Sequence, residues 1–194
     1  YTLELKVDGK TYTRAVRVIN DPRVGQSAAM MAALRAQNRL NRLAYEGMQA
    51  SYKAGQEVAG VEKSVAKLEQ SGAGDVRAQA RRVAEDLKPF AAAPGGFGGF
   101  RRRAAAPGAM QSFRELNNTF SDMIYRVQVG YDMAPTPAQL ATGTADCKTY
   151  EQTLEAWNRL ESGSLMRLNQ ALTAQHEATL ALGGAGLQDR ACGR

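Results

Sequence analysis

The chain contains one histidine, so His176 is the sole candidate for an imidazole general base. A catalytic site also needs a nucleophile and a group that orients the base. The cysteine nearest in sequence is Cys192, and neither Cys147 nor Cys192 has the CxxC spacing of a redox or zinc site. We therefore interpret His176 as an exposed helical residue, and we expect no catalytic residue, no metal site and no cofactor.

Two pairs of carboxylates are spaced closely enough for acid and base work: Glu85 with Asp86, and Glu151 with Glu155. Glu151 and Glu155 are four residues apart and would be neighbours on one helix face. Acid catalysis at neutral pH needs an apolar pocket that raises the pKa of one carboxyl. The neighbouring sequence indicates no such pocket, so we predict that all four carboxylates lie on solvated faces.

Aromatic and cationic residues are combined in the glycine-rich segment 90–108. Its Gly95–Phe100 run lacks the Gly-Lys-Ser/Thr ending and the preceding strand of a phosphate-binding loop. Aromatic and Arg side chains are the ones that anchor protein interfaces. We expect either a solvated mobile loop or a docking segment for an acidic protein surface or anionic lipid headgroups. The docking residues would be Phe97, Phe100, Arg101, Arg102 and Arg103.

The charge distribution supports a basic interaction face. The formal net charge is +6, and residues 1–108 carry 18 basic and 10 acidic side chains, against 7 and 9 in residues 109–194. Such asymmetry favours association with acidic partners and acts on association rate before specificity. Since no apolar run approaches the roughly 18 residues that a spanning helix needs, we predict no transmembrane segment.

The first 19 residues alternate between apolar and polar types about Asp8-Gly9, which is the pattern of a β-hairpin. The apolar positions of one face are Tyr1, Leu3, Leu5, Val7, Tyr12, Val16 and Val18. Because an isolated two-stranded hairpin is marginal in water, this face either packs on the chain's own helices or meets another polypeptide. We expect the second, with Tyr1, Leu3 and Leu5 as contact residues.

We interpret residues 1–24 as the remnant of a β-sandwich domain. The remaining chain shows no other convincing strand, the first residue is Tyr rather than Met, and there is no signal peptide. These features predict a processed or excised C-terminal piece of a longer protein.

The 44% hydrophobic content and the helical spacing of apolar residues predict a mainly α fold. We expect an antiparallel bundle of about four helices over residues 25–182, preceded by the N-terminal hairpin and followed by a flexible tail at 183–194. The first helix would run from Gln26 to Ser71, with Gly55 and Gly60 as points where it bends or divides.

The later helices are predicted from caps and breakers. Asp75 would cap the second helix, and Pro89 would close it. The third would span residues 109–131, with Met110, Phe113, Leu116, Phe120, Ile124 and Val127 facing inward. Thr136 would cap the fourth, with Pro137 in the first helical position.

The fourth helix carries a stripe of Leu140, Cys147, Tyr150, Leu154 and Trp157. We expect Trp157 to be buried and the helix to kink near Ser162-Gly163. From there it would continue to Gly183-Gly184.

The order of these features resembles the C-terminal region of bacterial sortilin-like, VPS10-type proteins with BNR repeats, often labelled glycosyl hydrolases. The resemblance rests on four stretches: Tyr1–Thr13, Asp21–Arg23, Ala134–Gln139, and Trp157 with Leu168–Leu172. In that family a β-propeller precedes an immunoglobulin-like domain that ends in this hairpin, and a helical bundle follows. The chain lacks the propeller and most of the sandwich, so no catalytic residue of the family maps onto it.

The resemblance implies an exported protein, located in the periplasm or outside the cell. Any association with a membrane would be peripheral. Export would permit a disulfide between Cys147 and Cys192; the alternative is that Cys147 is an ordinary buried thiol. Export also argues against nucleic acid as a partner of the Arg-rich loop.

We hypothesise a non-catalytic interaction or scaffolding module, an accessory subunit that binds other proteins of an exported or envelope assembly. The alternative is the C-terminal tail of a secreted carbohydrate-acting enzyme whose active region lies upstream.

Overall fold

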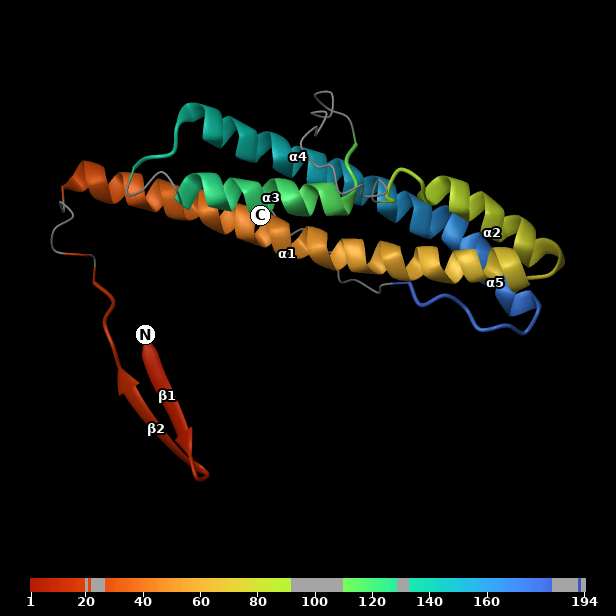
Figure 1. The fold of residues 1–194 in the computed structure, drawn as a ribbon, viewed down its shortest axis with the longest axis horizontal. Helices are drawn as coiled ribbons and strands as arrows, with labels where there is room; N and C mark the ends of the chain where they lie inside the picture. The colour runs from red at the N-terminus through yellow and green to blue at the C-terminus, as the bar shows by residue number, and fades with distance from the viewer. Residues whose placement is uncertain (20, 22–26, 92–109, 129–132, 183–191, 193–194) are drawn as a thin grey trace, which may run out of the picture.

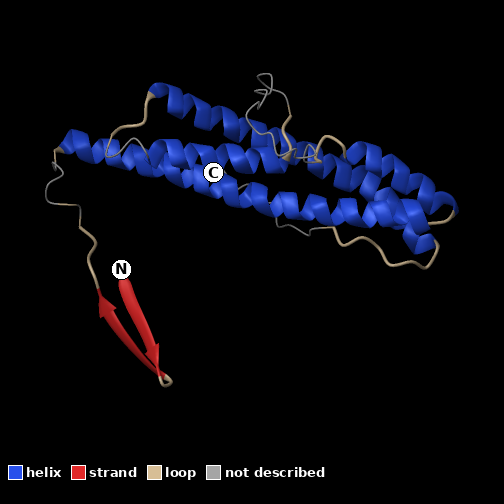
Figure 2. Cartoon of the chain, viewed as in Figure 1, coloured by secondary structure: helices blue, strands red, loops and turns tan. Residues whose placement is uncertain are grey.

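The computed structural model describes residues 1–19, 21, 27–91, 110–128, 133–182 and 192. Within them, the chain forms a two-stranded hairpin followed by an elongated bundle of helices (Figure 1). Strand structure in the described residues is confined to the hairpin, and helices account for most of the rest (Figure 2). The predicted fold class, mainly α with an N-terminal β-hairpin, is confirmed.

The hairpin pairs β1 (Thr2–Val7) with β2 (Lys10–Ala15) in antiparallel register, with Leu5 opposite Tyr12. Asp8 and Gly9 adopt φ values of 48° and 73°, the positive values that the predicted type I′ turn requires. The register places the odd-numbered residues of β1 on one face together with the even-numbered residues of β2.

The bundle is organised around α1 (Ala28–Ser71), a single helix of 44 residues. It begins at Ser27, whose Oγ accepts a hydrogen bond from the Met30 amide at 3.1 Å. The expected division at Gly55 or Gly60 is wrong, since α1 runs through both glycines. The physical reason is packing: buried residues continue along this stretch, and tertiary contacts outweigh the weak helix propensity of glycine. These buried residues include Ala54, Val58, Val61 and Val65.

Helix α2 (Gly74–Leu87) packs against the last turns of α1. The expectation that Asp75 caps it is wrong, because Ala73 occupies the N-cap position and makes no side-chain cap bond. Asp75 instead lies in the first turn, where its negative charge interacts favourably with the helix dipole.

Helix α3 (Phe113–Gln128) starts four residues later than predicted, and residues 129–131 lie outside the described chain. Its start is fixed by Ser112 and Glu115: the Glu115 Oε2 accepts from the Ser112 amide at 2.9 Å, and the Ser112 Oγ accepts from the Glu115 amide at 3.3 Å. This reciprocal pair is a capping box. Met110 therefore precedes the helix and is 37% exposed, which corrects its predicted inward position.

Helix α4 (Pro137–Leu160) begins at Thr136 with a full capping box to Gln139, as the Thr136-Pro137 pair predicted. Near the predicted kink, residues Glu161–Leu165 form a π-helical turn, and α5 (Met166–Ala174) continues from it. The expected extension to Gly183 is wrong, because α5 ends at Ala174. Leu140 is 46% exposed, so the predicted buried stripe of α4 starts one turn later, at Gly143.

The core is centred on an aromatic cluster between α1, α3 and α4. Trp157 is fully buried, as predicted, and Phe90 meets it edge to face at 5.4 Å between ring centroids. Phe90 was expected in the solvated loop, but its ring is 5% exposed. Residues 92–108 of that loop lie outside the described chain.

A segment after α5 is held on the bundle through a side-chain amide. The Asn169 Nδ2 donates to the Leu180 carbonyl at 3.1 Å, and its Oδ1 accepts from the Leu180 amide at 2.8 Å. Leu180 and Leu182 are half-buried against the core. Leu180 therefore packs as predicted, although it does so outside any helix.

Candidate interaction surfaces

The apolar face of the hairpin is open to solvent along its whole length. Tyr1 is 86% exposed, Leu3 and Leu5 are each 61% exposed, and Tyr12 is 57% exposed. Lys10 and Arg14 share this face, opposite Val7 and Leu3, and the other face carries the polar residues Thr2, Glu4, Lys6, Thr11 and Thr13. A solvent-exposed sheet face with this polarity is the pattern of a protein contact surface.

Two backbone hydrogen bonds join the strands at the open end of the hairpin. The Tyr1 ammonium donates to the Val16 carbonyl at 3.0 Å, and the Val16 amide donates to the Tyr1 carbonyl at 2.8 Å. This pairing holds Tyr1 on the apolar face beside Val16. The predicted contact residues Tyr1, Leu3 and Leu5 thus lie on one surface.

The other predicted contact residues cannot be placed. Phe97, Phe100, Arg101, Arg102 and Arg103 lie outside the described residues. The proposed docking of this segment on an acidic protein surface or on anionic lipid headgroups stays a prediction.

The two cysteines are joined in the structure, with their Cα atoms 5.7 Å apart. Cys147 lies on the buried stripe of α4, and Cys192 is half-buried against the core. The bond closes a sequence separation of 45 residues, so it ties the C-terminal end of the chain to the middle of α4.

The single histidine, His176, forms part of the C-terminal cap of α5. His176 follows α5 with a φ of 58°, in the left-handed region. Its amide donates to the Thr173 carbonyl at 3.1 Å, and the Glu177 amide donates to the Leu172 carbonyl at 2.9 Å. These two bonds make a Schellman motif, in which the residue at the His176 position is usually glycine. The exposed position agrees with the prediction, although His176 follows the helix rather than belonging to it.

The two carboxylate pairs are not brought together into a site. Glu85 pairs with Lys88, and the Asp86 Oδ2 accepts a hydrogen bond from the Ser164 hydroxyl at 2.6 Å. Glu155 lies 3.7 Å from Arg159 on the exposed face of α4. Glu151 is half-buried, whereas Glu85, Asp86 and Glu155 are exposed as predicted.

A different carboxyl pair is formed where the π-helical turn meets α1. Burial, together with a hydrogen bond and charge repulsion from Glu57, raises the pKa of Glu161 to about 7. One proton shared by two carboxyls lets both approach without full repulsion. No local pattern predicts this contact, because the two residues are about a hundred positions apart in the chain.

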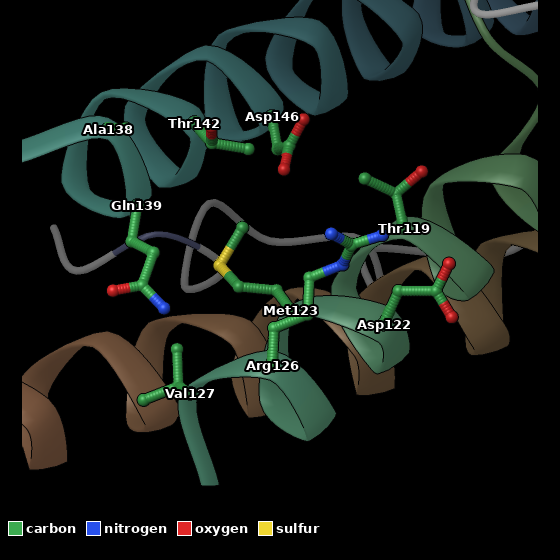
Figure 3. A pocket seen from close by; sticks show the side chains of 9 residues that line it. All are labelled: Thr119, Asp122, Met123, Arg126, Val127, Ala138, Gln139, Thr142 and Asp146. Carbon is green, nitrogen blue, oxygen red and sulfur yellow. The ribbon is translucent and has the colours of Figure 1, made fainter. Parts of the chain in front are cut away.

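A cavity of about 410 Å³ lies between α3 and the first turns of α4. Figure 3 shows Met123 and Arg126 reaching into it from α3 and the Asp146 carboxylate directed into it from α4. Val127 and Ala138 supply further apolar surface. The cavity therefore combines an apolar wall with charged groups of both signs.

Asp146 is the unusual member of this cavity. Its Oδ2 is enclosed and has no hydrogen-bond partner among the described residues. Burial raises the pKa of Asp146 to about 6. The charged form of this carboxyl is therefore poorly compensated by the protein itself.

Reasoning from the sequence missed this cavity. A signal was present, since Gln139, Thr142 and Asp146 recur at helical spacing on α4, opposite Thr119, Asp122 and Arg126 on α3. Helical spacing places each set on one face, but it does not indicate which helices face each other or how far apart they lie.

Within the described ranges, no helix is long and apolar enough to cross a membrane, and no group of three or more His, Cys, Asp or Glu side chains could hold a metal ion. No protein-family model, curated protein or solved structure matches the chain.

Proposed function

We propose that the chain is a non-catalytic interaction module whose hairpin docks onto another protein, as an accessory subunit of an exported or membrane-associated assembly. The observation that carries the proposal is the exposed apolar face of the hairpin, formed by Tyr1, Leu3, Leu5, Val7 and Tyr12. The helical bundle has its own aromatic core and does not use this face.

The occupant best suited to the face is β structure of a second polypeptide. A two-stranded ribbon has two open edges, each with unpaired backbone donors and acceptors that accept a further strand. Helices can cover an apolar face but supply no backbone hydrogen bonds to a strand edge. Strand addition would satisfy the edge while a second sheet or loop covers the apolar face.

The disulfide supports the exported setting, because such bonds persist in oxidising compartments. The exported setting also follows from the resemblance to the sortilin-like family, which is an expectation based on the quoted motifs. Under the alternative, the hairpin would pack within the same secreted enzyme, against a domain upstream of this chain.

The expected strength of the contact follows from the buried area. Fully burying one leucine contributes about 1.5–3 kcal/mol, and each 1.4 kcal/mol changes an affinity about tenfold. Replacing Leu5 by Asp should therefore weaken partner binding by at least about tenfold. It should leave the helical content of the bundle unchanged, because the Leu5 side chain is 61% exposed.

The proposal is tested by site-specific photo-crosslinking of the full chain in the cells that make it. A benzophenone amino acid at Leu5, on the apolar face, should give a defined protein adduct that maps to a strand of the partner. The same group at Lys6, on the opposite face, is the matched control and should give much less. Equal crosslinking at both positions, or none at Leu5, would overturn the proposal. An adduct to an upstream segment of the same polypeptide would favour the enzyme-tail alternative instead.

A further inference from the structure

We propose that the cavity between α3 and α4 binds a small organic monocation, an ammonium group on a short apolar chain, with Asp146 as its counter-ion. This inference is independent of the hairpin. It rests on three observations about the cavity: its size, the polarity of its walls, and the incompletely satisfied carboxylate that lines it.

The size suits a small molecule. Ligand pockets typically enclose about 300–1,000 Å³, and this cavity encloses about 410 Å³. Its walls are predominantly apolar, with Met123 and Val127 from α3 and Ala138 from α4. A flexible methionine in the wall can adapt to the shape of an alkyl chain.

The charge balance selects a cation. The titratable groups that line the cavity are Asp122 and Arg126 on α3 and Asp146 on α4, which sum to one negative charge when all are ionised. Arg126 reaches into the cavity from α3 (Figure 3), but Arg126 and Asp122 are both exposed to water, whereas Asp146 is half-buried. The carboxylate that gains most from a cation is therefore Asp146.

The unsatisfied oxygen gives the site its driving force. Because the Asp146 Oδ2 is enclosed without a hydrogen-bond partner in the described chain, the ionised carboxylate is less stable than it would be in water. An ammonium group in the cavity would stabilise that charge, while its alkyl chain covers Met123 and Val127. A neutral alcohol of the same length would gain only the apolar contact with Met123 and Val127 and would not stabilise the carboxylate charge.

The test follows the side-chain methyl group of Met123 by NMR in the full-length protein labelled with ¹³C-methyl methionine. The probe is n-butylammonium, and n-butanol and butyrate are the neutral and anionic controls of matched length. We expect a saturable shift of the Met123 signal with n-butylammonium and at least tenfold weaker binding of n-butanol. Equal binding of the amine and the alcohol would overturn the proposal, and so would a site that prefers butyrate.

Two isosteric variants assign the counter-ion. Asp146→Asn should weaken n-butylammonium binding at least tenfold, whereas Asp122→Asn, a carboxylate lining the same cavity, should weaken it less than threefold. Similar losses in both variants would show only a general charge effect and would contradict the assignment.

The pH dependence gives a check on the unmodified protein. Since the pKa of Asp146 is raised to about 6, about one-tenth of the carboxyl is ionised at pH 5 and nearly all at pH 8. The ammonium stays charged throughout this range, so binding should weaken about tenfold from pH 8 to pH 5. An affinity that does not change with pH would overturn the role of Asp146.

Discussion

A tight contact between α1 and α3 at Gly47 allows a stability prediction with an internal control. A Cβ atom at Gly47 would lie 2.6 Å from the Phe120 Cζ, whereas a Cβ atom at Gly60 would have nothing within 4 Å. Both glycines lie inside α1. Gly47→Ala and Gly60→Ala are therefore the same chemical change in the same helix, and they differ in what the added methyl group meets.

The expected magnitudes follow from two opposing effects. Alanine is favoured over glycine in a helix interior by about 1 kcal/mol, and this gain applies at both positions. Only Gly47→Ala adds the cost of overpacking, about 1–3 kcal/mol, since the Phe120 ring is fully buried and packs on Tyr150 with 6.4 Å between centroids. Gly60→Ala should therefore stabilise the protein by about 1 kcal/mol, and Gly47→Ala should be less stable than Gly60→Ala by about 1–3 kcal/mol.

The measurement is urea-induced unfolding of both variants and the parent, followed by far-ultraviolet circular dichroism and by the fluorescence of Trp157. The helix-propensity gain cancels between the variants, so their difference reports the contact with Phe120. If Gly47→Ala were as stable as Gly60→Ala or more stable, the close packing of α1 on α3 at this position would be refuted.

Three further predictions concern the second half of the chain. His176→Gly should raise the free energy of unfolding by about 0.5–1 kcal/mol, because glycine adopts the left-handed cap conformation without strain. A lower Tm for this variant than for the parent would contradict the Schellman cap. Reducing the bond between Cys147 and Cys192 should lower the free energy of unfolding by up to about 4 kcal/mol, the loop-entropy value for this separation. Peptide mass analysis without reductant should show the two cysteine peptides joined. Free thiols at both positions would rule the bond out. The pKa of Glu161 is raised to about 7 from its ordinary value of 4.5, so the folded chain keeps a proton that the unfolded chain loses above pH 4.5. The contribution of this group to stability therefore falls as pH rises from about 4.5 to 7. Glu161→Gln should therefore raise the Tm relative to the parent more at pH 8 than at pH 5, and an equal effect at both would mean that the pKa of Glu161 is not raised in the folded chain.

Local signals predicted most of the secondary structure. Asp8-Gly9 predicted the hairpin turn, Thr136 with Pro137 predicted the start of α4, and Ser162-Gly163 predicted the irregular turn before α5. In each case the residue type acts through its own backbone or its nearest neighbours, so no tertiary information is needed.

The errors arose where distant contacts decide the outcome. Phe90 follows Pro89 in a glycine-rich context that predicts a loop, yet its ring packs on Trp157. α1 continues through Gly60 because of its packing. The early end of α5 is the exception, because it is set by a local cap at His176 and by no distant contact.

Of the candidate surfaces, the hairpin face could be predicted from local sequence, whereas the cavity between α3 and α4 could not. The exposed hairpin face follows from alternation alone, since a strand puts alternate residues on one side. The cavity beside Asp146 depends on the separation of α3 and α4, which no local pattern encodes.

The length of α1 has a mechanical consequence for an interaction module. At 1.5 Å per residue, 44 residues span about 66 Å, and α3 and α2 brace successive parts of this span (Figure 1). In sequence, the hairpin precedes the N-terminal end of α1, and the contact between α2 and α5 lies toward the C-terminal end of α1. Two proteins that bound at the two ends of α1 would therefore be held apart by the length of this helix, so the bundle can set a distance between two contacts.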